Sequence, residues 1–547
     1  MNSKLLPVLL FYLAFIPALA DRYPKNPKVD VLHYSFRIEL SDGADEIKCK
    51  EDIEVRFADS GVSALRFDLV NISDASGGKG MKVSQVIADG RTLSFTHENN
   101  ELIFSLPTAS IRQQKTTYTI IYSGVPATGL RIADNKYGDR TFFSDNWPDK
   151  GRNWLCLVDH PSDKATCEFI VTAPSHYQVV SNGLKVEESF ISGDMKLTHW
   201  KQSVPIAPWL YVLGAARFAI QYVDTFDHKS IETWVYYQDR NNGFYDFAEP
   251  TKDVLEFYSA MIGPFVYEKL ANIQSNSVSG GMEAASAILY SENSVVGDRN
   301  ERWRTVVIHE IAHQWFGNAV TEYDWDDVWL SEGFATYFTL LFIEHQYGKE
   351  AFAKGLAGSR KTVLDFEARN PNYRIVHDNL SDMSKVTSSH TYQKGSWVLH
   401  MLRGMMGNDK FWKGIRAYYG KYMNGNASTT DFRQEMEQAS GLDLKIFFDQ
   451  WLYKGGIPKL EGTWKFNSNK KQIEILLNQV QSGVNLFHMP LQIGVYPTSG
   501  AAPVFKTVQI GEKQNTFIVP WDSPPAEVRL DPDVWVLMES NFIQLKK

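Results

Sequence analysis

The sequence has 547 residues, of which 44% are hydrophobic types and 13% are aromatic, more than one small core can bury. The formal net charge of −8, with no run of lysine and arginine interleaved with aromatics, argues against nucleic acid as a partner. We therefore expect a multidomain α+β protein.

The first twenty residues have the pattern of a signal peptide. Lys4 precedes an apolar stretch from Leu5 to Ile16, and Ala18-Leu19-Ala20 forms a small-x-small cleavage pattern. The stretch is shorter than the roughly 20 residues that a membrane-spanning helix needs, although an N-terminal anchor helix is the alternative. With no later apolar span, we expect cleavage after Ala20 and an exported, soluble mature protein, periplasmic or secreted.

Residues 21–221 are expected to form an N-terminal antiparallel β domain. Short runs such as Tyr34–Leu40 and Thr117–Tyr122 are rich in aromatic and β-branched residues, and Gly, Asn and Asp interrupt them. The three cysteines are too few for a disulfide framework and lack metal-binding spacing. Cys156 and Cys167 flank an expected hairpin, where one disulfide and two buried thiols are both open.

Residues 222–455 change to longer, helical periods after one strand at Glu232–Tyr237. The expected helices are Thr305–Phe316, Val328–Tyr347, Gly395–Met406 and Leu444–Tyr453. From 456 to 547 the chain returns to strand-like runs separated by Pro, Gly and Asn, which predicts a small C-terminal β-sandwich and no C-terminal helical domain.

The central region contains a His-Glu-x-x-His motif inside an apolar helix. Positions i and i+4 share one helix face, so His309 and His313 are expected to present imidazole nitrogens to one zinc ion. Glu310 lies about 100° around the helix from His309 and is expected to act as a base on water rather than as a ligand. The alternative is that the motif arises by chance.

Glu332 is the expected third ligand, nineteen positions after His313 on the following helix. Asp326 or Asp327 is expected to cap that helix. Two histidines and one glutamate with an open fourth position are the pattern of a catalytic zinc site, whereas a structural site is closed by four protein ligands. We expect one Zn²⁺ per chain.

These residues resemble the zinc aminopeptidases of the aminopeptidase N and leukotriene hydrolase type, a gluzincin branch. The pattern HExxH, eighteen residues, then Glu is met by His309–His313 and Glu332, within the wider matches His313–Asn318 and Trp329–Gly333. The resemblance implies a thermolysin-like catalytic domain.

Two further blocks carry the resemblance. Gly280-Gly281-Met282-Glu283 is similar to the Gly-x-Met-Glu-Asn exopeptidase motif, which implies that Glu283 binds the free α-ammonium of a peptide. Tyr392, in a segment similar to the Tyr-x-Lys-Gly block of the family, is implied to donate to the oxyanion of the transition state. Without the resemblance, these residues are a plain turn and a helix-start aromatic.

The residues that depart from the family pattern are at positions that the resemblance implies for substrate binding. Ala284 stands where the family has Asn, and Ser144-Asp145-Asn146-Trp147 lacks the Gln or Glu that the first domain supplies, so Asp145 is at most a substitute. We expect a zinc aminopeptidase acting on peptides with a free N-terminus. A thermolysin-type endopeptidase and a non-catalytic peptide-binding relative are the alternatives.

Overall fold

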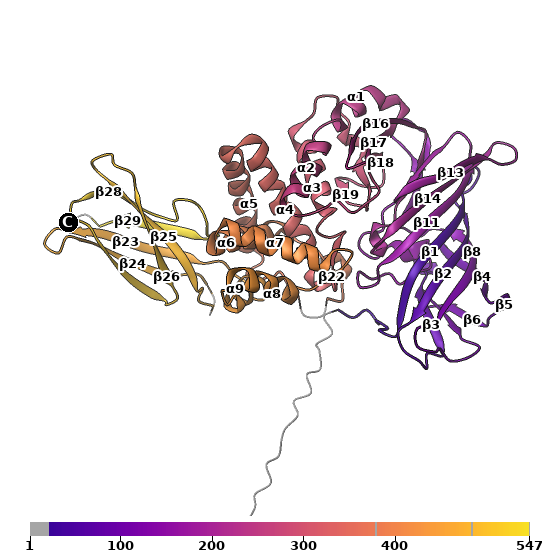
Figure 1. Ribbon diagram of the computed structural model, residues 1–547, viewed down its shortest axis with the longest axis horizontal. Coiled ribbons are helices and arrows are strands. Elements are labelled where there is room, and N and C mark those ends of the chain that lie inside the picture. The colour runs from indigo at the N-terminus through magenta and orange to yellow at the C-terminus, as the bar shows by residue number, and fades with distance from the viewer. Residues whose placement is uncertain (1–20, 378–379, 483–484, 546–547) are drawn as a thin grey trace, which may run out of the picture.

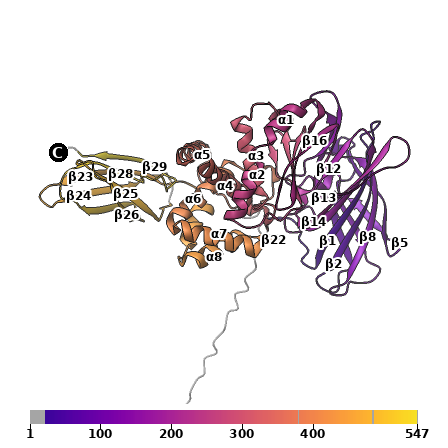
Figure 2. The ribbon, with the colours of Figure 1, turned by 45° about the horizontal axis from the view of Figure 1, so that its top comes forward.

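The computed structural model describes residues 21–377, 380–482 and 485–545. The expected signal peptide, residues 1–20, lies outside the described residues. The chain forms three parts that follow one another along the long axis, with helices between two β-rich parts (Figures 1 and 2). A β-rich N-terminal part, a helical centre and C-terminal β-sheets were expected and are confirmed.

The N-terminal part is built on an eight-stranded sheet in the order β13-β14-β11-β1-β2-β8-β4-β5. Buried and exposed residues alternate along β2 because one sheet face covers the core. The pairs of this sheet are antiparallel, as expected, except that of β1 with β11, which is parallel. The eight strands are β1 (Val29–Glu39), β2 (Ile47–Phe57), β4 (Gly80–Ala88), β5 (Arg91–Thr92), β8 (Lys115–Val125), β11 (Ala165–Pro174), β13 (Leu184–Phe190) and β14 (Met195–Ile206).

Two smaller sheets complete this part, in the orders β12-β15-β10-β9 and β3-β7-β6. Their strands are β3 (Ala64–Asp68), β6 (Phe95–Glu98), β7 (Glu101–Ser105), β9 (Leu130–Asp134), β10 (Arg140–Ser144), β12 (Gln178–Ser181) and β15 (Leu213–Ala216). Cys49, Cys156 and Cys167 are buried and unbonded, so Cys156 and Cys167 form no bridge.

The central part opens with a five-stranded sheet in the order β16-β17-β18-β20-β19. Its strands are β16 (Phe218–Phe226), β17 (Lys229–Tyr236), β18 (Lys269–Ser275), β19 (Gly281–Met282) and β20 (Ala287–Ser291). β16 runs across the expected boundary between residues 221 and 222 and pairs with β17. Every residue of β18 is buried, as in a parallel strand covered on both faces.

Nine α-helices are described in the central part. They are α1 (Arg240–Phe247), α2 (Thr251–Met261), α3 (Glu301–His313), α4 (Trp329–Tyr347), α5 (Lys349–Arg369), α6 (Gly395–Met406), α7 (Asn408–Tyr422), α8 (Thr429–Ser440) and α9 (Lys445–Leu452). A short parallel pair, β21 (Val320–Glu322) and β22 (Gly425–Ala427), joins the region after α3 to the region before α8. Among the described helices, none combines the length and apolar character needed to cross a bilayer.

The expected capping of α4 by an aspartate was wrong. The cap residue is Val328, which has no side-chain oxygen. Asp327 instead accepts from the backbone N–H of Thr429 at 3.1 Å and from its hydroxyl at 2.5 Å, and Asp326 accepts from the Leu380 N–H at 3.0 Å. Both carboxylates therefore fasten α4 to distant segments.

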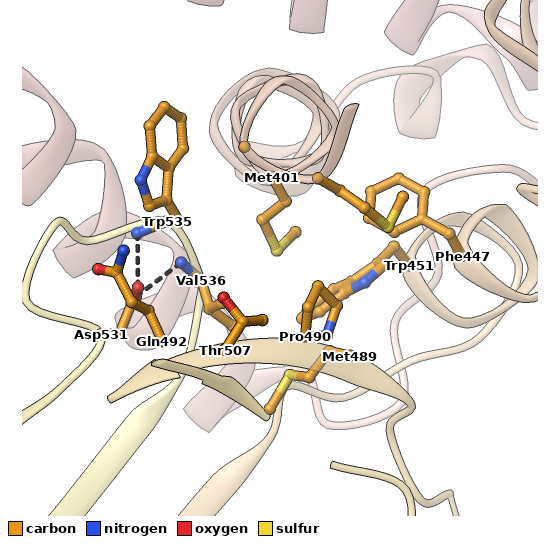
Figure 3. A pocket seen from close by; sticks show the side chains of 12 residues that line it. Met401, Phe447, Trp451, Met489, Pro490, Gln492, Thr507, Asp531, Trp535 and Val536 are labelled. Carbon is orange, nitrogen blue, oxygen red and sulfur yellow. Dashed lines mark hydrogen bonds between the residues drawn. The ribbon is translucent and has the colours of Figure 1, made fainter. Parts of the chain in front are cut away.

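The C-terminal part contains two packed sheets, β27-β24-β23-β29 and β26-β25-β28. Their strands are β23 (Lys459–Asn467), β24 (Gln472–Gln479), β25 (Met489–Pro497), β26 (Val504–Ile510), β27 (Gln514–Pro520), β28 (Pro525–Leu530) and β29 (Glu539–Gln544). A pocket lined by Met401, Trp451 and Met489 lies where this part meets α6 and α9 (Figure 3). Asp531 accepts there from the N–H groups of Trp535 and Val536, at 2.9 and 2.7 Å.

Candidate metal centre and active site

Helix α3 brings the two histidines of the motif together. Asn300 starts the helix by accepting from the Arg302 N–H at 3.0 Å. Nε2 of His309 and Nε2 of His313 lie 3.1 Å apart, one turn from each other on the same face. His313 is buried, whereas the side chain of His309 is 21% exposed, so the pair opens toward solvent on the His309 side.

Helix α4 adds Glu332 to the pair. Its Oε2 lies 3.2 Å from Nε2 of His313 and 3.5 Å from Nε2 of His309. Helices α3 and α4 contact each other, and the connection between them contains β21. The structure therefore groups the three expected ligands.

The three donor atoms fit a tetrahedral zinc ion. Bonds of about 2.0–2.1 Å in a tetrahedron place ligand atoms about 3.3 Å apart, and the observed separations of 3.1, 3.2 and 3.5 Å bracket that value. The buried Oε2 of Glu332 accepts no hydrogen bond, although both imidazole nitrogens are near. The atoms are thus arranged around a common point.

The electrostatics of the cluster also suit a divalent cation. Burial by itself would lower the pKa of His313, but the carboxylates of Glu332, Glu283 and Glu310 raise it to about 10. Burial lowers the pKa of His309, which favours its neutral, ligating form. Several buried carboxylates around two imidazoles make a negative site that a metal ion would neutralise.

A second layer of contacts orients His313. Its Nδ1 donates to the carbonyl of Phe316 at 3.2 Å and lies 3.0 Å from the hydroxyl of Ser331, which leaves Nε2 as the atom with a free lone pair. Gly317 has φ +110°, and a Cβ there would lie 2.2 Å from Oγ of Ser331. Sequence reasoning assigned no role to Ser331 or Gly317, although both lie inside the motif matches.

Tyr392 lies beside the same cluster, on a π-helical turn that leads into α6. Its hydroxyl donates to Oε1 of Glu332 at 2.9 Å, and its ring stacks on that of His309 with centroids 6.2 Å apart. Glu332 therefore directs one oxygen to Tyr392 and the other to the histidines.

Two glycines set the distance between α4 and this turn. A Cβ on Gly333 would lie 3.0 Å from Cα of Gly395, so neither position accepts a side chain without a shift of backbone. Lys394, between Tyr392 and Gly395, donates to the carbonyl of Gly456 at 3.0 Å and ties the turn to the start of the C-terminal part.

Glu310 is packed against the strand β19. A Cβ on Gly281 would lie 2.2 Å from Oε1 of Glu310, so the glycine leaves the space that this carboxylate occupies. Burial raises the pKa of Glu310 well above its ordinary value, and the neighbouring Glu283 raises it further. Met282 pairs with Leu289 of β20, which fixes the register of the strand.

Glu283 directly follows β19 and is buried, and its Oε1 accepts no hydrogen bond. Its backbone carbonyl accepts from Nε2 of Gln314 at 3.0 Å and from Nδ2 of Asn318 at 2.7 Å. The side-chain amides of Gln314 and Asn318, which follow α3, thus hold the Glu283 backbone beside that helix. Gly280 closes the other end of the segment by accepting from the Ser291 N–H at 2.8 Å.

The two residues that depart from the family pattern, Ala284 and Asp145, have different surroundings in the structure. Ala284 is buried beside Glu283 and offers no side-chain hydrogen bond. Asp145 forms an ion pair with Lys150 at 2.7 Å and lines a pocket of the N-terminal part together with Gly129 and Arg131. Its carboxylate is therefore already paired with Lys150.

The fold and donor set define a protein of the His-Glu-x-x-His class in which a glutamate on the next helix completes the site. Residues 247–451 match the peptidase family M1 domain, and residues 31–210 match the peptidase M1 N-terminal domain. The chain belongs to the peptidase M1 family.

Similar proteins carry aminopeptidase names. The chain is 27% identical over 342 residues to glutamyl aminopeptidase of Mus musculus, a match covering 60% of this chain and 36% of that protein. It is 31% identical over 352 residues to aminopeptidase A of Gloydius brevicauda, covering 61% and 36%. For aminopeptidase M1-A of Oryza sativa subsp. japonica the identity is 27% over 361 residues, covering 63% and 40%. The matches thus span little more than a third of each relative.

Proposed function

We propose that this chain is a zinc-dependent aminopeptidase that removes the N-terminal residue from peptides. The observation that carries the proposal is the convergence of His309, His313 and Glu332 on one point, with Oε2 of Glu332 lacking a hydrogen bond. Family membership and the names of the relatives support the same activity.

His309, His313 and Glu332 would hold the zinc ion. When bound, zinc supplies Lewis-acid chemistry that polarises a carbonyl and acidifies water. Glu310 would take a proton from the attacking water and pass it to the nitrogen of the leaving amine, a role that its position beside but outside the ligand set supports. The Tyr392 hydroxyl would turn from Glu332 to the substrate oxygen as negative charge develops there.

Glu283 would make the reaction an exopeptidase reaction. A buried carboxylate oxygen without a donor favours a cation, and a free N-terminus is a cation with three N–H groups. Binding that ammonium would place only the first peptide bond at Glu310. Gly280, Gly281 and Met282 would position the carboxylate and leave room for the substrate backbone.

The test is a panel of aminoacyl amides, assayed with and without a chelator, on the wild type and Glu310→Gln. We expect turnover that chelation abolishes, Zn²⁺ restores and Glu310→Gln removes. An N-acetylated peptide should not be cleaved. Cleavage of the acetylated peptide would instead indicate an endopeptidase, and zinc binding without any turnover would indicate a non-catalytic relative.

We also propose that the mature chain is exported after cleavage behind Ala20, on the strength of the leader-like pattern in residues 1–20. Intact mass of the protein recovered from outside the cytoplasm should correspond to a chain that begins at Asp21. Recovery of the full-length mass from that fraction would contradict cleavage.

A further inference from the structure

The segment that carries Glu283 continues into a tight turn between β19 and β20. The Ala287 N–H donates to the carbonyl of Ala284 at 3.1 Å and closes this turn. Ser286, inside the turn, has φ +64°, in the left-handed region that residues other than glycine seldom adopt. Such a conformation persists only where the surrounding structure holds it. The neighbours of the turn must therefore fix its shape.

The N-terminal part supplies two of the contacts to this turn. Nδ2 of Asn182 donates to the carbonyl of Ala285 at 2.7 Å. The N–H of Gly183 donates to Oγ of Ser286 at 2.8 Å. Both donors directly follow β12, and both bonds are buried. The turn beside Glu283 is thus bonded to a segment that lies 103 residues earlier in the chain.

Asn182 is itself held in one orientation. Nδ2 also donates to the Leu210 carbonyl at 2.8 Å, and Oδ1 accepts from the Val212 N–H at 2.8 Å. Both N–H donors and the carbonyl oxygen of the amide are therefore engaged. Gly183 has φ +74°, and a Cβ there would lie 1.9 Å from the carbonyl oxygen of Lys201. The pair Asn182–Gly183 is thus a rigid support for the turn.

The histidine-bearing helix α3 holds the same turn through Gln314, which directly follows His313. Oε1 of Gln314 accepts from the Ser286 N–H at 3.0 Å, and its Nε2 donates to the Glu283 carbonyl at 3.0 Å. Oε1 of Glu283 accepts no hydrogen bond. The position of this oxygen therefore depends on the backbone that carries it, and that backbone is held from both parts of the chain.

The turn has few side chains with which to fix itself. Residues 284, 285 and 287 are alanines, which offer no side-chain hydrogen bond. Ser286 is the exception, and its hydroxyl accepts from the N–H of Gly183. Support for the turn must therefore come from outside it, and Asn182 is the side chain of the N-terminal part that bonds to its backbone.

We propose that Asn182 is a positioning residue for Glu283. Through the turn, the N-terminal part sets where the carboxylate meets the α-ammonium of the substrate. This inference rests on the proposed aminopeptidase function and deepens it, because amine recognition then depends on both parts of the chain. Asn182 does not belong to the group of His309, His313 and Glu332, so its loss should affect recognition of the amine and not of the metal.

The test compares two ligands of the zinc-loaded protein that differ only in the amine. An aminoacyl hydroxamate and the matching acyl hydroxamate without the amino group share the metal-binding end. The ratio of their dissociation constants, measured by calorimetry, therefore reports recognition of the amine. We expect Asn182→Ala to lower the wild-type preference for the amine-bearing compound about tenfold, since a misplacement of about 1 Å costs up to about a hundredfold. Binding of the compound without the amine should stay unchanged.

A second variant, Ser286→Ala, tests the same turn with a smaller change. It removes the hydroxyl that accepts from Gly183 and keeps the backbone bond to Gln314. We expect a shift of the ratio in the same direction by about threefold, the scale of one neutral hydrogen bond. Because only one oxygen atom is lost, this variant decides the matter if Asn182→Ala does not fold.

A matched control is Asn515→Ala in the C-terminal part. Asn515 is also buried, and its Nδ2 donates to the Glu512 carbonyl at 2.7 Å while Oδ1 accepts from the N–H groups of Gly511 and Glu512 at 3.2 Å. The control should keep the wild-type ratio. A wild-type ratio in Asn182→Ala, or equal weakening of both ligands, would overturn the proposal. Where Asn182→Ala does not fold, the same results in Ser286→Ala would overturn it.

Two outcomes separate this inference from the underlying function. If the wild type hydrolyses no aminoacyl amide, or binds both hydroxamates equally, the proposed function fails. If Glu283→Gln abolishes the preference of the wild type for the amine but Asn182→Ala keeps it, Glu283 binds the amine without help from the N-terminal part, and the inference alone fails.

Discussion

Among the described residues, two groups of histidine and carboxylate side chains lie close enough together to hold a metal ion, and they differ in what balances their charge. In the first, His309, His313 and Glu332 surround a point and Oε2 of Glu332 lacks a hydrogen bond. In the second, ligand atoms of His160, Asp21 and Asp324 also lie within 4.8 Å of one another.

The second cluster contains its own cation. Nζ of Lys25 lies 2.9 Å from Asp21 and also contacts Asp324, while Nε2 of His160 is 2.6 Å from Asp21. Tyr23 stacks on His160 with centroids 4.6 Å apart. The Lys25 ammonium balances the two carboxylates, so this cluster fastens the start of the described chain to the segment before α4. Spacing of donors alone therefore does not identify a metal site, because the second cluster contains an ammonium group that balances its carboxylates.

The largest expected effect is the loss of zinc from the first cluster. His313→Ala removes one ligand and its contacts to Phe316 and Ser331, so we expect metal content to fall to background and kcat/KM to fall by about 10³-fold or more. Metal analysis and aminoacyl amide kinetics measure both. His160→Ala is the matched histidine variant. Loss of zinc from this variant would contradict the assignment of zinc to the first cluster.

Removal of Lys25, the cation of the second cluster, should lower the free energy of unfolding and leave catalysis unchanged. Lys25→Met leaves two carboxylates without their partner, and breaking such a pair costs about 3 kcal/mol in the free energy of unfolding. Denaturant unfolding should show this loss, with zinc content and the kcat/KM of the folded protein unchanged. Adding Asp21→Asn and Asp324→Asn should recover part of the stability. A variant as stable as the wild type would contradict the role given to Lys25.

A smaller effect is expected from Gly281→Ala. The added Cβ would overlap the carboxylate of Glu310, so that carboxylate must shift by an ångström or more. We expect kcat to fall about tenfold to a hundredfold with zinc content intact, since misplacement on this scale has that cost. Gly358→Ala on α5, where a Cβ also meets nothing within 4 Å, is the control. Equal kinetics in both variants would contradict the packing argument.

The smallest effect concerns pH. Burial lowers the pKa of His160 below its ordinary value of 6.5, although the hydrogen bond to Asp21 opposes this. Its contribution to stability is therefore complete above pH 6.5 and is lost as the pH falls toward the folded-state pKa. Urea unfolding at pH 7.5 and 5.5 should show a larger loss in the wild type than in His160→Gln. Identical losses would show that another group dominates this range.

The grouping of His309, His313 and Glu332 could be predicted because the information for it is local. The i, i+4 spacing of His309 and His313 fixes their shared face, and the length of the connection to Glu332 allows one antiparallel return. The alternation in β2 and the apolar run of α4 similarly reflect which faces are buried. The prediction of an aspartate cap for α4 was wrong because Asp327 accepts instead from Thr429, a residue far along the chain.

The sequence by itself determined the His-Glu-x-x-His motif, the three-part order and the positions of four of the nine described helices, α3, α4, α6 and α9, since each depends on periodicity over a few turns. Only the tertiary structure decided that Tyr392 reaches Glu332 and that Lys25 pairs with Asp21 and Asp324. These relations join residues far apart in the chain or depend on which donors are already used. A sequence pattern does not show whether a charged side chain has a partner, because packing in the tertiary structure determines that partner.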